Sequence, residues 1–352
     1  MLTTVVAFLG VLAVLILAHE LGHFVTAKAR GVKVEEFGLG FPPRLLSIRR
    51  GGTRYSLNAV PLGGFIKMAG EEDPSSPGSL ASKSIGSRLL ILSAGSLMNA
   101  ISPLLLFSIS FMIPHDVVIG QVIVEEVVPG APAAMADIET GDIILSIDGK
   151  PVRNIGDLQR NIYLNLGNGV PLRVKHVNST TEAVQLTPRW RPPAGQGATG
   201  IVIRLSNPTV TRQYYPFWQA IPMGVIECIE TFALFKNGII SMIIGTAPAA
   251  VAGPVGIAQI TGEAAKAGIS PLLNFAAFLS INLALINMFP LPALDGGRIM
   301  FVLLEWVRRG RRISPRTEGK IHFVGFAMLI AAILLITYQD IMRIISGGSL
   351  IP

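Results

Sequence analysis

Long apolar runs alternate with polar stretches along this chain. The runs occupy residues 3–28, 87–113, 272–294 and 321–345. Each reaches or exceeds the ~20 residues that an α-helix needs to cross ~30 Å of hydrocarbon. The pattern therefore predicts four transmembrane helices, the third broken near its end by Pro290 and Pro292. Non-helical backbone survives at membrane depth only beside protein or a water-filled cavity. The break therefore predicts that this part of the third helix lies against other protein segments or lines a cavity.

A fifth apolar stretch, residues 217–251, is interrupted by Glu227, Glu230 and Lys236. A spanning helix would bury each charge at a cost of about 2.5–3.5 kcal/mol. An amphipathic helix at the membrane interface would keep the charges in water. We expect the interfacial helix, with a fifth span as the alternative.

The polar stretch between the first two runs predicts short β-strands over residues 33–70. In Val60-Pro-Leu-Gly-Gly-Phe-Ile-Lys67, strand-forming residues lie on both sides of the turn-forming Gly63 and Gly64. A small β-element associated with the membrane surface is the structure that this pattern favours.

The second polar stretch, residues 116–206, predicts one compact α+β module. Its order is a strand, a Pro-Gly turn, a short helix, a Gly-Asp turn, a strand and an Asp-Gly hairpin, then a helix at 155–166 and strands at 170–177, 182–188 and 199–205. This order resembles a PDZ domain, with an unrelated small β-rich domain as the alternative. The predicted fold is thus an α-helical multi-pass membrane protein with a small β-element and an inserted PDZ-like domain, divided at 1–32, 33–86, 87–113, 116–206, 207–270, 271–310 and 311–352.

Composition agrees with a membrane protein and charge predicts its orientation. Half of the 352 residues are apolar and 14% are charged, against about a quarter in soluble domains. Ten Lys or Arg residues lie in 28–88 and seven in 298–320, but only eleven in the longer stretch 115–270. Positive loops face the cytoplasm, so the module is expected outside. The net charge of +7 would suit a nucleic-acid-binding protein, but the sequence contains no patch of basic and aromatic residues. This argues against nucleic-acid binding.

Candidate metal chemistry lies on the first apolar run, at His19-Glu20-x-x-His23. On a helix, two histidines four residues apart share one face and can take adjacent corners of a tetrahedral zinc. Glu20 can then act as general base on water. Polar residues inside an apolar helix are costly unless something binds them. The alternative is that the span ends at Ala18 and that these side chains lie among the lipid headgroups.

A catalytic zinc needs a third protein ligand. The single cysteine, Cys228, excludes a thiolate-rich site. Asp295, directly after the proline-broken third run, is the preferred candidate over the histidines elsewhere in the chain; its alternative role is to cap a helix and pair with Arg298. By charge counting, Asp295 and the histidines both fall near cytoplasmic ends of their spans, which is independent support. The histidines set aside are His115, His176 and His322.

Taken together, these motifs resemble the site-2 protease family of intramembrane zinc metalloproteases, in its RseP-like branch with a single PDZ domain. The resemblance rests on His19–His23, on Asn287-x-x-Pro-x-x-x-Leu-Asp-Gly296 and on Gly95-x-x-x-Asn99. It implies that His19, His23 and Asp295 bind Zn²⁺, that Glu20 is the catalytic base, and that Asn287 holds substrate or the oxyanion. It also implies that the β-element around Gly63 and Gly64 pairs with an unwound substrate. Gly95 and Asn99 are expected to serve helix packing rather than catalysis.

The implied function is hydrolysis of peptide bonds in the transmembrane segments of membrane proteins in the bacterial cell membrane. The expected partners are single-pass substrates such as pre-trimmed anti-sigma factors or signal-peptide remnants, peptide termini at the PDZ-like module, and the lipid bilayer, with no nucleic acid. The active site is expected near the cytoplasmic face. Two alternatives are an inactive PDZ-bearing membrane scaffold and a metal transporter. A transporter would need an inverted repeat or paired broken helices, and only one span is broken.

Overall fold

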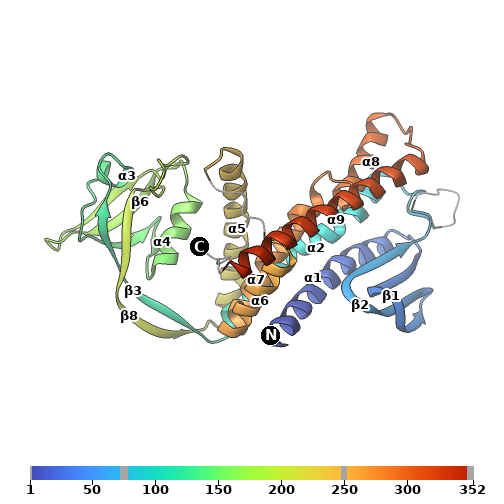
Figure 1. The fold of residues 1–352 in the computed structure, drawn as a ribbon, viewed down its shortest axis with the longest axis horizontal. Helices are drawn as coiled ribbons and strands as arrows, with labels where there is room; N and C mark the ends of the chain where they lie inside the picture. The colour runs from blue at the N-terminus through green and yellow to red at the C-terminus, as the bar shows by residue number, and fades with distance from the viewer. Residues whose placement is uncertain (1, 72–77, 247–251, 347–352) are drawn as a thin grey trace. The chain divides into compact units, whose positions relative to one another are not determined.

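The computed structural model describes residues 2–71, 78–246 and 252–346, which form two compact units. The membrane unit takes in 1–110, 220–224 and 251–352, and the central unit takes in 111–219 and 225–250. The elements of the membrane unit are α1 (Leu2–Ala29), β1 (Val34–Arg50), β2 (Thr53–Met68), α2 (Ile85–Met112), α6 (Pro254–Ala267), α7 (Ile269–Met288), α8 (Asp295–Val307) and α9 (Pro315–Ile345) (Figure 1).

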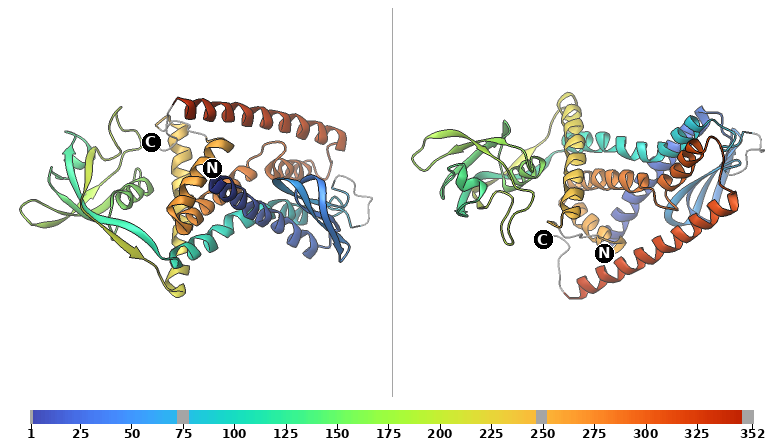
Figure 2. Two further views of the ribbon diagram at one scale, coloured as in Figure 1. Left: turned by 60° about the horizontal axis from the view of Figure 1, so that its bottom comes forward. Right: turned by 90° about the horizontal axis from the view of Figure 1, so that it is seen from above.

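Four helices among the described residues are long and apolar enough to cross a membrane, as predicted. They are α1, α2, α7 and α9. The third ends six residues earlier than predicted, because Phe289 turns to an extended conformation before Pro290 and Asp295 then starts the separate helix α8. No residue in the most apolar window of α9 is buried, and α9 lies along the outside of this unit in both views of Figure 2.

The β-element consists of two long, bent strands beside α1 (Figure 1). Residues 36–39 of β1 pair on one side with 54–57 of β2 and on the other with 64–67, while 44–50 pair with 53–58. The two strands thus supply four short paired segments, and the segment at 64–68 lies at an edge of the sheet. The predicted short strands are present as straight segments of two longer, bent strands.

Two hydrophobic clusters hold α1 in place on either side of a polar interval. Val11 and Leu15 pack with residues of α7, and Ala27 packs with residues of β1, α2 and α8. These three positions and the two histidines recur every fourth residue, so they form one stripe along the helix. The histidines therefore face the interior of the membrane unit.

The central unit is a six-stranded antiparallel sheet with helices. The strand order is β7-β6-β4-β3-β8, with β5 paired to β4. Its apolar core joins the sheet to the third and fourth helices of the chain. Its elements are β3 (His115–Val127), α3 (Pro132–Met135), β4 (Ile143–Ile147), β5 (Lys150–Pro151), α4 (Ile155–Leu164), β6 (Val170–Lys175), β7 (Thr181–Leu186), β8 (Ile201–Gln213) and α5 (Phe217–Ile243) except for its residues 220–224.

Helix α5 covers most of the ambiguous fifth apolar stretch. With 27 residues it is long enough to cross a membrane, but it is not among the four described helices that are both long and apolar enough to do so. Its acidic residues pair within the central unit. Arg160 of α4 binds Glu227 at 2.8 Å and Glu230 at 3.2 Å, and Lys150 also binds Glu230. Burial raises the pKa of Glu227 despite the neighbouring Arg160. Ion pairing with the module, rather than solvation alone, thus accommodates these charges.

Candidate metal centre

Helix α1 brings two imidazoles together on its buried stripe. The Nε2 atoms of His19 and His23 are 3.3 Å apart, and the two rings meet edge to face. The side chain of His23 is 7% exposed and that of His19 13%. Two buried imidazoles with their nitrogens directed at one point need a shared partner, since burying a polar group without one is costly.

Asp295 supplies that partner from another part of the chain. Its Oδ2 lies 3.1 Å from His19 Nε2 and 3.2 Å from His23 Nε2. Asp295 is the first residue of α8, and the connection from α7 is so tight that any side chain on Gly296 or Gly297 would collide with the backbone of 288–291. Glycine is required there, and it allows the carboxylate to turn back onto α1.

The three donor atoms fit a zinc ion by their chemistry and spacing. Two neutral imidazoles and one carboxylate form a common ligand set for catalytic zinc. Ligand atoms ~2.0–2.1 Å from a tetrahedral zinc lie roughly 3.3–3.4 Å from one another, close to the three observed separations of 3.1, 3.2 and 3.3 Å. His19, His23 and Asp295 are the only such cluster within the described part of the chain.

Gly95 of α2 leaves the room that this ion needs. A methyl group added at Gly95 would lie 2.7 Å from His19 Nε2 and even closer to His23 Nε2. We expected Gly95 to serve helix packing. It also faces the donor atoms of the two histidines, so it borders the metal centre. A neighbouring contact does serve packing, because a Cβ on Gly22 of α1 would collide with the carbonyl of Ala94.

Hydrogen bonds from α2 orient both imidazoles. His23 Nδ1 donates to the carbonyl oxygen of Ile91 at 2.8 Å, which leaves Nε2 as the metal-binding atom. His19 Nδ1 lies 3.3 Å from the side-chain amide of Asn99, whose other amide atom, Oδ1, is buried without a hydrogen-bond partner. A half-turn of the amide lets Oδ1 accept from Nδ1–H.

Asn99 is thus a positioning residue, where the sequence suggested helix packing. Its backbone carbonyl also accepts a hydrogen bond from Ser280 of α7 at 2.8 Å, so it joins the packing of three helices. Gly95 and Asn99 are one helical turn apart, so they share one face of α2, and the packing of α2 against α1 directs that face at the histidines.

Glu20 lies beside the metal ligands and against the β-element. A Cβ added at Gly64 of β2 would lie 3.0 Å from Glu20 Cγ and 2.9 Å from a methyl of Ile16. The absence of a side chain at Gly64 therefore lets the β2 backbone approach the base. Gly63 faces the other way, toward the ring of Phe41. Of the two glycines, only Gly64 borders the site.

Asn287, the remaining predicted site residue, lies half-buried in the last turn of α7, and no hydrogen bond of its amide occurs among the described residues. Its role stays a prediction. The alternative role of Asp295 as the partner of Arg298 is wrong, because Arg298 binds Glu71 at 3.0 Å instead. His322 is not a ligand either: its Nδ1 accepts from the backbone of Ala293 at 2.9 Å and so holds the loop before Asp295.

Comparison with known proteins decides the family. Residues 7–332 match peptidase family M50. The chain belongs to that family. It is 36% identical over 331 residues to a protein of Clostridium acetobutylicum, covering 93% of this chain and 94% of that one. A protein of Clostridium perfringens is 37% identical over 334 residues, 93% and 95% of the two chains. Both are provisionally named zinc metalloproteases.

A further M50 relative is the zinc metalloprotease RasP of Geobacillus kaustophilus. It is 26% identical over 426 residues, covering 97% of this chain and 98% of RasP. The predicted zinc metalloprotease activity and the predicted Zn²⁺ cofactor are confirmed by family membership. When bound, zinc supplies a Lewis acid that activates water and polarises a carbonyl group. In this M50 protein His19, His23 and Asp295 would hold it.

A buried ion pair supports the helix that carries the third ligand. Glu305 of α8 binds Arg88 of α2 at 2.6 Å and Arg312 at 3.0 Å, and its side chain is 8% exposed. Burial alone would raise the pKa of Glu305, but the hydrogen bonds from Arg88 and Arg312 outweigh it and hold the pKa below the ordinary 4.5. The ion pair keeps α8 against α2, next to the metal centre.

We expect Glu305→Gln to destabilise the protein by about 3–5 kcal/mol, because it leaves the largely buried Arg88 without its anion. With a lowered folded-state pKa, the contribution of Glu305 is present above about pH 4.5 and is lost as pH falls through that folded pKa. Thermal unfolding in detergent at several pH values measures both effects. The variant should unfold at lower temperature at pH 7 and approach the wild type in acid. The exposed Glu263→Gln is the control, and an equal loss there would contradict the assignment.

Proposed function

We propose that this M50 protein is an intramembrane protease that hydrolyses peptide bonds within the transmembrane segments of single-pass membrane proteins. The observation that carries the proposal is the place of the metal centre within its helix. His19 and His23 lie 10 and 6 residues before Ala29, the end of α1, which is about 15 and 9 Å along the helix. At those depths a peptide bond must enter the hydrocarbon region to reach Glu20.

The residues around the centre support a specific division of labour. Glu20 takes a proton from the attacking water and returns it to the leaving amine. The edge segment at 64–68 offers free backbone groups to an extended peptide, as in strand addition, and Gly64 keeps that edge beside Glu20. Asn287 is the proposed donor to the oxyanion. A helical carbonyl is already hydrogen-bonded and covered, so the substrate segment has to unwind before it is cut.

The test is cleavage of a tagged single-pass substrate, already trimmed outside the membrane, in liposomes that contain the purified protein. We expect a cut inside the transmembrane segment, inhibition by a zinc chelator, and faster cleavage when glycine or proline is placed near the cut, because each weakens a helix by about 1–3 kcal/mol. Mass spectrometry of the fragments locates the cut. Cleavage confined to residues outside the apolar segment would refute the proposal.

We propose further that the central module is a PDZ domain outside the cytoplasm, acting on peptide termini, and that the metal centre lies near the cytoplasmic face of a bacterial cell membrane. The order of its strands and helices and the positive loops support this. Pre-trimmed anti-sigma factors and signal-peptide remnants are the proposed substrate classes. A substrate would pass this module before it enters the membrane. The module could therefore select substrates in two ways, by capturing trimmed ones or by excluding untrimmed ones.

Removing residues 115–213, the paired strands β3 and β8 with everything between, distinguishes capture from exclusion. If the module excludes bulky substrates, the shortened protein should cut untrimmed substrates that the full chain leaves intact. If the module captures substrates, cleavage of trimmed substrate should fall while zinc content is unchanged. Unchanged cleavage of both substrate forms would contradict any role of the module in selection.

A further inference from the structure

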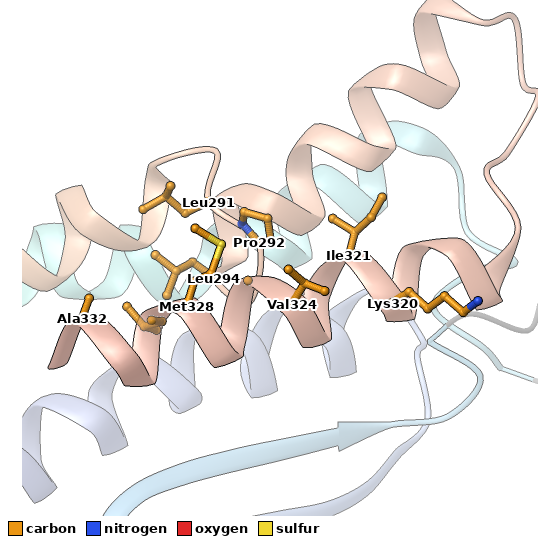
Figure 3. Close-up of a pocket in the computed structure, with 10 residues that line it drawn as sticks. Leu291, Pro292, Leu294, Lys320, Ile321, Val324, Met328 and Ala332 are labelled. Atoms are coloured by element: carbon orange, nitrogen blue, oxygen red, sulfur yellow. The ribbon is translucent and has the colours of Figure 1, made fainter. Parts of the chain in front are cut away.

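An apolar cleft lies between α9 and the loop that precedes Asp295. Its volume is about 500 Å³. Leu291, Pro292 and Leu294 line one side, and Val324, Met328 and Ala332 of α9 line the other (Figure 3). The two sides touch at Gly325, where any side chain would collide with Pro292. Because α9 lies on the outside of the membrane unit, this cleft is available to molecules of the bilayer.

One end of the cleft carries its only charged lining residue, Lys320 (Figure 3). The side chain of Lys320 is exposed and makes no ion pair among the described residues. It lies one turn after Arg316, in the first turns of α9. A positive charge at the mouth of an otherwise apolar cleft suits a ligand with an anionic head and an apolar tail.

The dimensions of the cleft match one acyl chain of one leaflet. From Lys320 to Ala332 the helix rises about 18 Å, slightly more than the ~15 Å of half a hydrocarbon core. A transmembrane helix of ~10 Å diameter would occupy roughly 1,400 Å³ over the same length, well above the volume of the cleft. An extended hydrocarbon chain is much thinner, so the cleft favours lipid over a substrate helix.

We propose that this cleft is a binding site for an anionic phospholipid, with an acyl chain against Val324, Met328 and Ala332 and its phosphate group at Lys320. The bound chain would fill the space beside Leu294, the residue next to the metal ligand Asp295. Lipid would thereby hold the 291–294 loop, which connects α7 to α8, against α9. The proposal requires the membrane location of α9 and is independent of which substrates the enzyme cuts.

The test uses the full-length protein in nanodiscs that contain phosphatidylcholine and a phosphatidylglycerol with a photoactivatable acyl chain. We expect labelling of the 291–294 loop and of the 324–332 segment, located by mass spectrometry. Met328→Trp should fill the cleft and strongly reduce that labelling. Leu334→Trp is the matched control, since Leu334 lies on the same helix, is 64% exposed and does not line the cleft.

The head-group contact is tested separately by a surface substitution that leaves the packing intact. Lys320→Gln should lower the preference for phosphatidylglycerol over phosphatidylcholine about fivefold, the effect expected of one lysine at an anionic surface. Arg316→Gln, a nearby exposed cation outside the cleft, should lower it less. Equal labelling by phosphatidylglycerol and phosphatidylcholine would overturn the proposal. So would an equal loss of labelling in Met328→Trp and Leu334→Trp, or an equal loss of lipid preference in Lys320→Gln and Arg316→Gln. Capture of a substrate segment instead of lipid by a crosslinker at Met328 would also overturn it.

Discussion

Replacing Glu20 with glutamine is expected to reduce proteolysis by about 10²–10⁴-fold, the contribution of a positioned general base. Glutamine keeps the size of the side chain beside Gly64 but cannot accept the proton of the attacking water. Since Glu20 is not among the three clustered donor residues, the variant should retain its zinc. Cleavage of a transmembrane substrate and the zinc content of the same purified sample measure the two properties together.

His23→Ala is the informative contrast for Glu20→Gln. It removes a donor atom and also the hydrogen bond to Ile91, so both zinc and activity should be lost. If Glu20→Gln cleaves as well as the wild type, Glu20 is not the base. If it loses zinc together with activity, its role is structural, and the division of labour proposed for the site is wrong.

The second large effect is expected from adding a single methyl group. Gly95→Ala places a Cβ within van der Waals overlap of the donor nitrogens of both histidines, in the space that the metal requires. The methyl faces imidazoles that are fixed by Ile91 and Asn99, so the rings cannot easily move aside. We therefore expect loss of bound zinc and, with it, loss of proteolysis.

Gly86→Ala on the same helix is the matched control, because nothing lies within 4 Å of a Cβ built there. Alanine is a better helix former than glycine by about 1 kcal/mol, so neither substitution should weaken α2 by itself. Zinc content by elemental analysis and cleavage of the model substrate would be normal for the control. A Gly95→Ala protein with full zinc content would show that the metal lies elsewhere.

Local periodicity is the reason that so much of this protein follows from the sequence. Hydrophobic length predicts a span because every backbone group inside lipid must be hydrogen-bonded within its own helix. A four-residue spacing puts His19 and His23 on one face for the same local reason. Asp295 could be assigned because few polar residues follow a broken span. These features depend only on the local sequence and on the surrounding water or lipid. The family that they indicated is the one that the comparison shows.

Contacts between distant segments were decided by the tertiary structure alone. No local pattern predicts that Asn99 meets His19, that Gly64 lies against Glu20, or that Arg298 binds Glu71 rather than Asp295. Each depends on how helices and strands pack, and a shift of one residue along an element turns a side chain to another face. The sequence by itself determined the spans and the metal-binding residue types. Packing determined which side chains orient the ligands, where a missing Cβ leaves room for the ion, and where α9 leaves a cleft open to lipid.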